Sequence, residues 1–275
     1  MEELRGAAVI LTGATGGIGP RIAAALWAQG ARLLLTARPG DGVESVQNGL
    51  DPTGSRTLAL GADLTAATAC EVIVDAAVQR FGGVDVVVNN AGIEGPMRLV
   101  DETPERLEAM VRLNLVAPLR LTRRVLPDML ARGRGHIVFV ASLAGLVPAP
   151  FNSTYSATKH ALVGLADSLS EELDGTGVGV SAVCPSGVRE AGMYTRWALE
   201  GSSSRVGTTT PDAVAAAVVR AIRSNRRQVL VAPPLTRLGP LLSTAAHPLL
   251  VRLYRRTGMV GALRRTAEQN ARRAG

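Results

Sequence analysis

Short apolar runs alternate with longer segments of helical character along most of this chain, and this alternation limits the fold more than any other feature. The runs expected to form strands are residues 7–12, 32–36, 57–62, 84–88, 135–140, 178–183 and 228–231. The segments between the first four of them hold helical stretches of about 12 to 20 residues. The pattern predicts an α/β fold with a doubly wound, mostly parallel sheet of seven strands, which binds ligands at the carboxyl ends of its strands.

A glycine cluster follows the first expected strand. It reads Gly13-Ala14-Thr15-Gly16-Gly17-Ile18-Gly19-Pro20, and a helical pattern then continues to Gly30. A strand, a glycine turn and a helix in this order put backbone N–H groups at a helix N-terminus, where a pyrophosphate can approach because no Cβ is in the way. We therefore expect a dinucleotide site, with an ordinary tight turn as the alternative. The glycines can be read as the triplet 13, 17 and 19 or as the triplet 13, 16 and 19.

The end of the second expected strand bears on the choice of cofactor. An acid at this place would bind the ribose 2′-hydroxyl of NAD, whereas an Arg accommodates the 2′-phosphate of NADP. Ala37 and Arg38 follow the strand. This favours NADP(H) over NAD(H), with a solvated loop charge as the alternative role of Arg38. Residues 39–55 are expected to be irregular, with one short helix.

Polar residues also stand just past three later strands. Asp63 follows the third, Asn90 the fourth and Ser142 the fifth. Because parallel strands end at one edge of the sheet, these residues are expected to face the ligand crevice. Thr65 is expected to cap the helix that ends at Phe81.

A long helical segment is expected over residues 103–132, with a break near Pro118. Asn114 lies inside it, between two leucines. A buried asparagine needs hydrogen-bond partners. It is either a structural residue with a satisfied amide or a member of a functional site.

Tyr155 and Lys159 form the pair that most suggests catalysis. The preceding Asn152-Ser153 is typical of a helix N-cap, so the two side chains are expected on one helical face. The chain has 30 Lys plus Arg residues, and Lys159 is the only lysine among them. Lysine is a compact, flexible point charge, unlike the rigid fork of arginine. The phenol and the ammonium can therefore meet over one substrate, although chance placement is equally compatible with the pair alone.

Composition excludes several classes of function. An aromatic content of 3% disfavours nucleic-acid binding, which relies on stacked aromatic rings. Cys70 and Cys184 are far apart and lack a histidine cluster, so we expect reduced core residues and no metal site. The first residues do not resemble a signal peptide, and no run of 18 uncharged apolar residues is present. A cytoplasmic protein is expected.

The net charge of +7 is unevenly distributed. Twelve arginines and one acid lie from Arg220 onward, so the rest of the chain is mildly acidic. We expect one nucleotide-binding and catalytic domain over residues 1–233 and a basic amphipathic extension over residues 234–275. The extension, with apolar Leu249, Leu250, Leu253 and Tyr254 between arginines, could pack on the body or a neighbouring subunit, or lie peripherally on an anionic inner membrane surface. Residues 189–210 lack periodicity and are interpreted as a flap over a substrate.

With these pieces assembled, residues 6 to 232 resemble the short-chain dehydrogenase/reductase family in its compact, single-domain form. The resemblance is carried by TGATGGIG, NNAG, Asn114, Ser142 and Tyr155-x-x-x-Lys159, in family order and with the serine 13 residues before the tyrosine. It implies a Rossmann fold and an NAD(P)-dependent oxidoreductase that interconverts a ketone or aldehyde and an alcohol. It also favours the glycine triplet 13, 17 and 19.

The resemblance implies a role for each matched residue. Tyr155 would be the general acid or base, and Lys159 would lower its pKa and hold the nicotinamide ribose. Ser142 would bind the substrate oxygen, and Asn114 would hold a water of a proton relay. The implied cofactor contacts are Gly13, Thr15, Gly17, Ile18, Gly19, Arg38, Asp63, Leu64, Asn90, Ala91, Gly92, Tyr155, Lys159, Pro185 and Val188. Two positions depart from the family: Gly16 stands where NADP-preferring members often have a basic residue, and Glu190 where a threonine often contacts the carboxamide.

The resemblance also implies a homodimer or homotetramer, paired through the long helices that include residues 115–131 and 153–173. A basic, apolar extension makes a hydrophobic substrate, of steroid, retinoid or lipid type, a reasonable expectation. Two alternatives stay open. One is a catalytically silent cofactor-binding regulator, and the other is an epimerase or dehydratase with a tightly bound cofactor.

Overall fold

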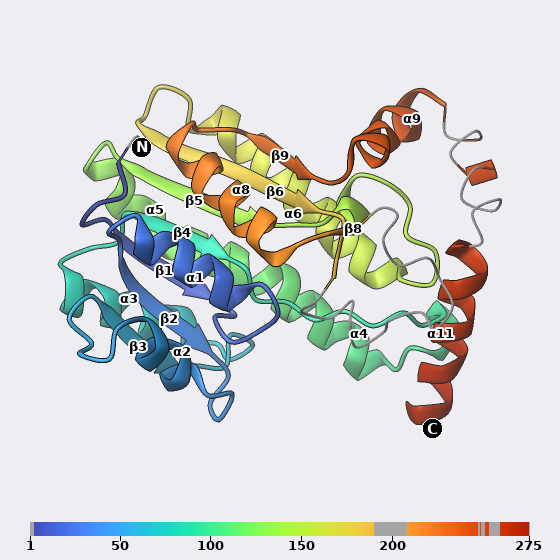
Figure 1. Ribbon diagram of the computed structural model, residues 1–275, viewed down its shortest axis with the longest axis horizontal. Helices are drawn as coiled ribbons and strands as arrows, with labels where there is room; N and C mark the ends of the chain where they lie inside the picture. Colours follow the sequence, from blue (N-terminus) through green and yellow to red (C-terminus); the bar gives the residue numbers. More distant parts are fainter. Residues whose placement is uncertain (1–2, 190–207, 247, 249–250, 253–258, 275) are drawn as a thin grey trace.

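The computed structural model describes residues 3–189, 208–246, 248, 251–252 and 259–274. The described residues form a seven-stranded sheet with helices on both faces (Figure 1). Its strands are β1 (Ala8–Thr12), β2 (Arg32–Ala37), β3 (Thr57–Gly61), β4 (Val86–Asn89), β5 (Gly135–Val140), β6 (Val178–Pro185) and β9 (Gln228–Val231). Their order is β3-β2-β1-β4-β5-β6-β9, and every pair in this sheet is parallel. The predicted doubly wound sheet is confirmed, and it is parallel throughout.

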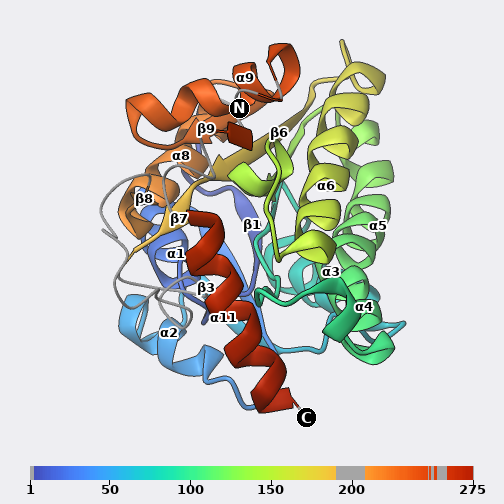
Figure 2. The ribbon, with the colours of Figure 1, turned by 90° about the vertical axis from the view of Figure 1, so that its right-hand side faces the viewer.

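The strands are buried on both faces, which explains their nearly continuous apolar sequences. Alternate residues of one strand enter two different cores: Ile10 packs with Val87 on one side, and Leu11 packs with Val88 on the other. The first core is covered by α3 (Ala69–Phe81), α5 (Ala117–Ala131) and α6 (Ser153–Glu172), the second by α1 (Gly19–Ala28), α2 (Val43–Leu50) and α8 (Pro211–Arg223). Figure 2 shows these two groups of helices on opposite sides of the sheet.

The direction in which successive strands are added reverses between β1 and β4: β2 and β3 lie on one side of β1, and β4, β5, β6 and β9 lie on the other. The loops after these two neighbouring strands leave the sheet in different directions, and a crevice opens between them at the carboxyl ends. The glycine cluster follows β1 and the Asn-Asn-Ala-Gly motif follows β4. Both motifs therefore lie at the switch point.

One of the two expected caps is wrong. Thr65 does not cap α3: its N–H and hydroxyl both donate to Asp63, and the helix begins only at Ala69. A more local partner thus takes the side chain that would otherwise bond to the first helical turn. Asn152 stands at the N-cap position of α6 as expected, but its side chain accepts no capping hydrogen bond, and its Nδ2 donates to Glu94.

The expected break in the long helical segment is a π-helical turn. It spans Arg112–Val116 and joins α4 (Pro104–Val111) to α5. Pro118 lies in the first turn of α5 and has no N–H to donate to the carbonyl four residues before it. That carbonyl belongs to Asn114, so the irregular turn carries the predicted site residue.

The C-terminal part contains η4 (Pro234–Leu238), α9 (Gly239–Ala245) and α11 (Met259–Ala274). α11 packs on the body, where Asn270 is buried and its amide donates to the Pro96 carbonyl at 2.7 Å. Figure 2 shows α11 crossing the carboxyl-end side of the sheet. Among the described residues, no helix is long and apolar enough to cross a membrane. Of the flap expected over residues 189–210, residues 190–207 with Glu190 lie outside the described residues, as do the apolar positions 249, 250, 253 and 254.

Candidate active site

The glycine loop has the shape of a cradle without side chains. Gly13 has a φ of +64°, and a Cβ built on it would lie 2.8 Å from Ala91 Cα. A Cβ on Gly19 would lie 2.2 Å from the Gly13 carbonyl oxygen, which is far inside contact distance. Gly17 has a φ of +39°, which side-chain-bearing residues rarely adopt. A Cβ on Gly16 would be 3.8 Å from its nearest neighbour, so the geometry requires the triplet 13, 17 and 19.

Asn90 holds this cradle to the loop after β4. Its side-chain amide donates to the carbonyls of Thr12 and Gly13, at 3.0 and 2.9 Å. The backbone N–H groups of Asn90 and Ala91 both donate to the Thr12 hydroxyl at 3.0 Å. The contact of Asn90 with the adenosine ribose stays a prediction. What the structure assigns to Asn90 is the coupling of two loops that border the crevice, which gives a nucleotide a rigid seat.

Arg38 and Asp63 lie at the carboxyl ends of β2 and β3. The Arg38 side chain is 72% exposed and pairs with Asp41 at 3.1 Å. The pKa of Asp63 is lowered, chiefly by the hydrogen bonds from Thr65 and less by the charge of Arg38. Two opposite charges thus flank the outer part of the crevice, beyond the glycine loop. Leu64, beside them, is buried.

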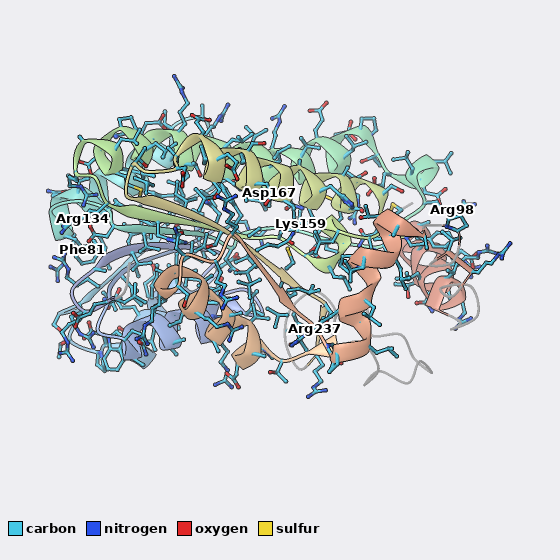
Figure 3. The ribbon with its side chains drawn as sticks, turned by 90° about the horizontal axis from the view of Figure 1, so that it is seen from above. Phe81, Arg98, Arg134, Lys159, Asp167 and Arg237 are labelled. Carbon is cyan, nitrogen blue, oxygen red and sulfur yellow. The ribbon has the colours of Figure 1, made fainter. Side chains whose placement is uncertain are left out.

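The expected pair stands at the start of α6. Tyr155 and Lys159 are both buried, on the face of α6 that contacts the sheet, and Figure 3 shows Lys159 between that helix and the strands. Lys159 Nζ donates to the Val140 carbonyl at 2.9 Å and lies 5.5 Å from the centre of the Tyr155 ring. Ser142, just past β5, accepts from the Ala144 N–H at 3.1 Å and lies near enough to Tyr155 to lower the pKa of its hydroxyl. The helical spacing of Tyr155 and Lys159 and the strand end at Ser142 therefore converge as expected.

Asn114 is fully buried and every polar atom of its amide is used. Its Oδ1 accepts from the Ile93 N–H at 2.8 Å, and its Nδ2 donates to the Ile93 carbonyl and to the Thr158 hydroxyl. A Cβ on Gly92 would lie 3.1 Å from Asn114 Oδ1 and 3.7 Å from Lys159 Nζ. The absence of a side chain at Gly92 thus leaves room between the asparagine and the lysine. The implied water at this place stays a prediction.

Burial dominates the electrostatics of the centre. It raises the pKa of Tyr155 above its ordinary value, the negative charge of Glu94 adds to this, and the Ser142 hydroxyl opposes it. Burial lowers the pKa of Lys159 to about 8, and Glu94 offsets part of that shift. The pKa of Cys184 is raised to about 12, so this buried thiol is protonated at neutral pH, as expected for a core cysteine. The lowering of the phenol pKa by Lys159 stays a prediction.

Glu94 is the residue that the sequence reasoning missed. It follows Asn89-Asn90-Ala91-Gly92-Ile93 at the end of β4, is half-buried, and accepts a hydrogen bond from Asn152 Nδ2 at 2.7 Å. Its own pKa is raised by burial, which Asn152 and Lys159 oppose. An acid two residues after a glycine motif at a strand end was the available signal, since such positions face the crevice.

The remaining predicted contacts surround this centre. Pro185 ends β6, and Val188 belongs to β7 (Gly187–Val188), which pairs with β8 (Thr208–Thr209). Thr15 and Ile18 lie within the glycine loop and are half-buried. Within the part of the chain that the structure describes, no cluster of His, Cys, Asp and Glu could hold a metal ion.

Residues 7–200 match the family model of the short chain dehydrogenases. The chain belongs to this family. A curated relative, ketoacyl reductase HetN from Nostoc sp., is 34% identical over 99% of this chain and 96% of its own length. A metagenomic short-chain oxidoreductase solved with NADP has a TM-score of 0.70 and 33% identity over 83% of this chain and 97% of its own.

A second solved relative, a variant of actinorhodin polyketide ketoreductase with NADPH, has a TM-score of 0.74 and 33% identity, covering 82% of this chain and 95% of its own. This short-chain dehydrogenase is therefore an oxidoreductase that uses a nicotinamide cofactor. The cradle without Cβ atoms at Gly13, Gly17 and Gly19 fits the pyrophosphate of such a cofactor.

Proposed function

We propose that this enzyme interconverts a ketone or aldehyde with an alcohol, with Tyr155 as general acid in reduction and general base in oxidation. One observation carries the proposal: Tyr155 lies near enough to Ser142, at the carboxyl edge of the sheet, for the serine to lower the phenol pKa, and the only lysine of the chain lies against its ring. A phenol and a hydroxyl side by side can both donate to one carbonyl oxygen. Two donors on the oxygen polarise the C=O bond and stabilise the negative charge that develops on the oxygen during reduction.

The residues of this chain have distinct tasks in the proposed reduction. A bound nicotinamide dinucleotide supplies the hydride when the carbonyl is reduced. Ser142 holds the substrate oxygen, and Tyr155 passes its hydroxyl proton to that oxygen. Lys159, as an ammonium, stabilises the phenolate that remains. Asn114 holds the Ile93 backbone beside Gly92 and keeps the space around Lys159 open for a returning proton.

We infer NADP(H) as the preferred cofactor. The two solved relatives named above contain NADP or NADPH. In this chain the exposed guanidinium of Arg38 stands past β2, with Asp41 as its counterion. A 2′-phosphate would exchange one anionic partner of Arg38 for another, and guanidinium–phosphate pairs are strong.

Replacing Arg38 by alanine is expected to weaken NADPH binding about tenfold, the factor for losing one charge-assisted hydrogen bond. NADH carries no 2′-phosphate, so its binding should stay within about twofold. Fluorescence titration with both cofactors measures the two dissociation constants. The control is Arg123→Ala, which removes an exposed arginine on α5. If Arg38→Ala weakened the binding of NADH and NADPH equally, Arg38 would be only a solvated loop charge.

We infer a hydrophobic, uncharged ketone as substrate, of ketoacyl, steroid, retinoid or lipid type. The name of the relative HetN, a ketoacyl reductase, supports the first of these, and an oxidoreductase of this family acts on a small molecule. A panel of such ketones, followed by the loss of NADPH absorbance, tests the proposal. Turnover of any of them supports it, whereas tight cofactor binding without turnover would favour a regulator or a redox-neutral enzyme.

We further infer a homodimer or homotetramer that pairs through the two long helices α5 and α6. Light scattering of the purified chain gives the mass in solution.

A cytoplasmic location and contact with an inner membrane surface through the basic extension stay predictions. Flotation of the full chain with anionic vesicles, and not with neutral ones, is the result expected for such contact.

A further inference from the structure

Five consecutive residues after the Asn-Asn-Ala-Gly motif are each tied to a different residue of the fold. The hydrogen-bonded pairs are Ile93 with Asn114, Glu94 with Asn152, Gly95 with Arg106, Pro96 with Asn270, and Met97 with Phe151. The partners come from the π-helical turn, the loop before α6, α4 and α11. A segment without regular secondary structure is therefore held by a hydrogen bond at every residue, and these bonds fix the position of the Glu94 side chain.

The C-terminal helix provides the most distant of these ties. Asn270 Nδ2 donates to the Pro96 carbonyl, and both residues are buried although 174 positions separate them. One turn earlier Ala267 is fully buried, and another turn earlier the Arg264 guanidinium lies 5.8 Å from the centre of the Phe151 ring. A spacing of three residues places all three on one face of α11. That face contacts both the segment after β4 and the loop before α6.

Phe151 is the point where these two pieces of chain meet. Its carbonyl accepts from the Met97 N–H at 2.7 Å, and the next residue, Asn152, donates to Glu94. Phe151 has a φ of +61°, which is rare for a bulky residue and persists only where the surroundings hold it. α11 therefore contacts the two loops directly in front of the helix turn that carries Tyr155.

We propose that Asn270 is a positioning residue for the catalytic centre, and that α11 thereby forms part of the active-site wall. By holding Pro96, Asn270 keeps Glu94 against Asn152, beside Tyr155 and Lys159. The inference rests on the proposed carbonyl chemistry, since this placement affects turnover only if Tyr155 transfers a proton. It makes the basic extension part of the catalytic machinery, although the family match ends at residue 200.

The charged and titratable neighbours of Glu94 show how its placement acts. Lys159 and Tyr155 lie on α6, with Cys184 of β6 behind them, while on the α4 side Arg106 donates to Gly95 and pairs with Glu102 at 3.7 Å. The negative charge of Glu94 raises the pKa of both the lysine and the phenol. Reduction requires both groups protonated, so it is lost as the pH rises through the Lys159 pKa of about 8. Displacing the Glu94 carboxylate lowers that pKa and moves the loss to lower pH.

The test compares Asn270→Ala with Gln269→Ala, which removes an exposed amide from the preceding position of the same helix. Asn270→Ala is expected to lower kcat about fivefold, the equivalent of about 1 kcal/mol for one lost hydrogen bond. Gln269→Ala should keep wild-type kcat, and both variants should bind NADPH normally, since α11 does not touch the glycine loop in any described contact. Wild-type kcat in Asn270→Ala would overturn the proposal.

The pH profile separates positioning of Glu94 from a merely structural loss. Glu94→Gln keeps the hydrogen-bond acceptor for Asn152 and removes the charge, so the alkaline limb of kcat should move down by about one pH unit. Asn270→Ala should move the same limb in the same direction by less. Glu105→Gln, an exposed acid on α4, should leave it in place. A fivefold loss in Asn270→Ala with an unmoved limb would refute the link through Glu94.

Hydrogen exchange gives a reading that does not depend on activity. Loss of the Asn270 tie should speed exchange in peptides that cover residues 93–97 and 151–153, where the Met97 N–H bonds to Phe151. Gln269→Ala should exchange like the wild type. If no ketone is turned over at all, the proposed function fails, but hydrogen exchange still tests whether the bond from Asn270 to Pro96 holds this segment. Unchanged exchange in Asn270→Ala would overturn the inference.

Discussion

Tyr155→Phe should lower kcat for carbonyl reduction about 10³-fold, the scale of losing a general acid in the transition state. The substitution removes one oxygen and keeps the ring that packs in the buried site, so the fold should be unaffected. Steady-state rates with NADPH and the best ketone of the panel measure the loss. The dissociation constant of NADPH should change little, because the glycine cradle lies at the ends of β1 and β4.

Ser142→Ala provides the graded comparison for this prediction. It removes the hydroxyl beside Tyr155, while the phenol can still donate to the substrate. Its expected loss is about 10²-fold, smaller than that of Tyr155→Phe, because the group that transfers the proton remains. If Tyr155→Phe kept a tenth or more of the wild-type rate, the proton would have to come from another group, and the proposed role of Tyr155 would be abandoned.

Gly19→Ala should abolish measurable nucleotide binding and lower the stability of the whole domain. The added Cβ would lie 2.2 Å from the Gly13 carbonyl oxygen and 2.7 Å from that of Ala14, and both obstacles are backbone atoms that cannot rotate away. Forcing atoms into a filled space costs about 2 kcal/mol or more. For a domain of this size that corresponds to a Tm lower by roughly 4–8 °C. Thermal melting with and without NADPH measures both effects.

Gly16→Ala is the matched control, because it adds the same methyl group to the same loop. Its Cβ would lie 3.8 Å from the nearest atom, an ordinary contact, so binding and Tm should stay close to those of the wild type. The pair thus decides between the two glycine triplets by experiment. Equal damage from both substitutions would contradict the assignment of residues 13, 17 and 19.

Much of the architecture could be predicted because it depends on local pattern. The strands Gly135–Val140 and Gln228–Val231 agree with the expected bounds, since apolar runs need no distant partner to be recognised. Tyr155 and Lys159 converge for the same reason: four residues along a helix always share a face. Ser142 joins them because parallel strands end at one edge.

The glycine loop marks the limit of this reasoning. The glycine spacing alone allows two triplets, and the choice between Gly16 and Gly17 depends on their backbone surroundings in the fold. Gly17 has a φ of +39°, whereas a Cβ on Gly16 would lie 3.8 Å from its nearest neighbour. The cap at Thr65 was wrong because Asp63 competes for that side chain, and Asn152, at the expected N-cap position, uses its side chain on Glu94. Such competition depends on distances that no local pattern contains.

By itself, then, the sequence determined the order of strands and helices, the parallel sheet, the switch-point crevice and the spacing of the catalytic pair, because all of these follow from periodicity along the chain. Only the tertiary structure decided that Glu94 faces Asn152, that Asn114 satisfies both ends of its amide, and that α11 rests on Pro96. These last contacts join residues 21, 58 and 174 positions apart. They depend on three-dimensional proximity of polar atoms that must find partners once buried, a condition that apolar periodicity does not encode.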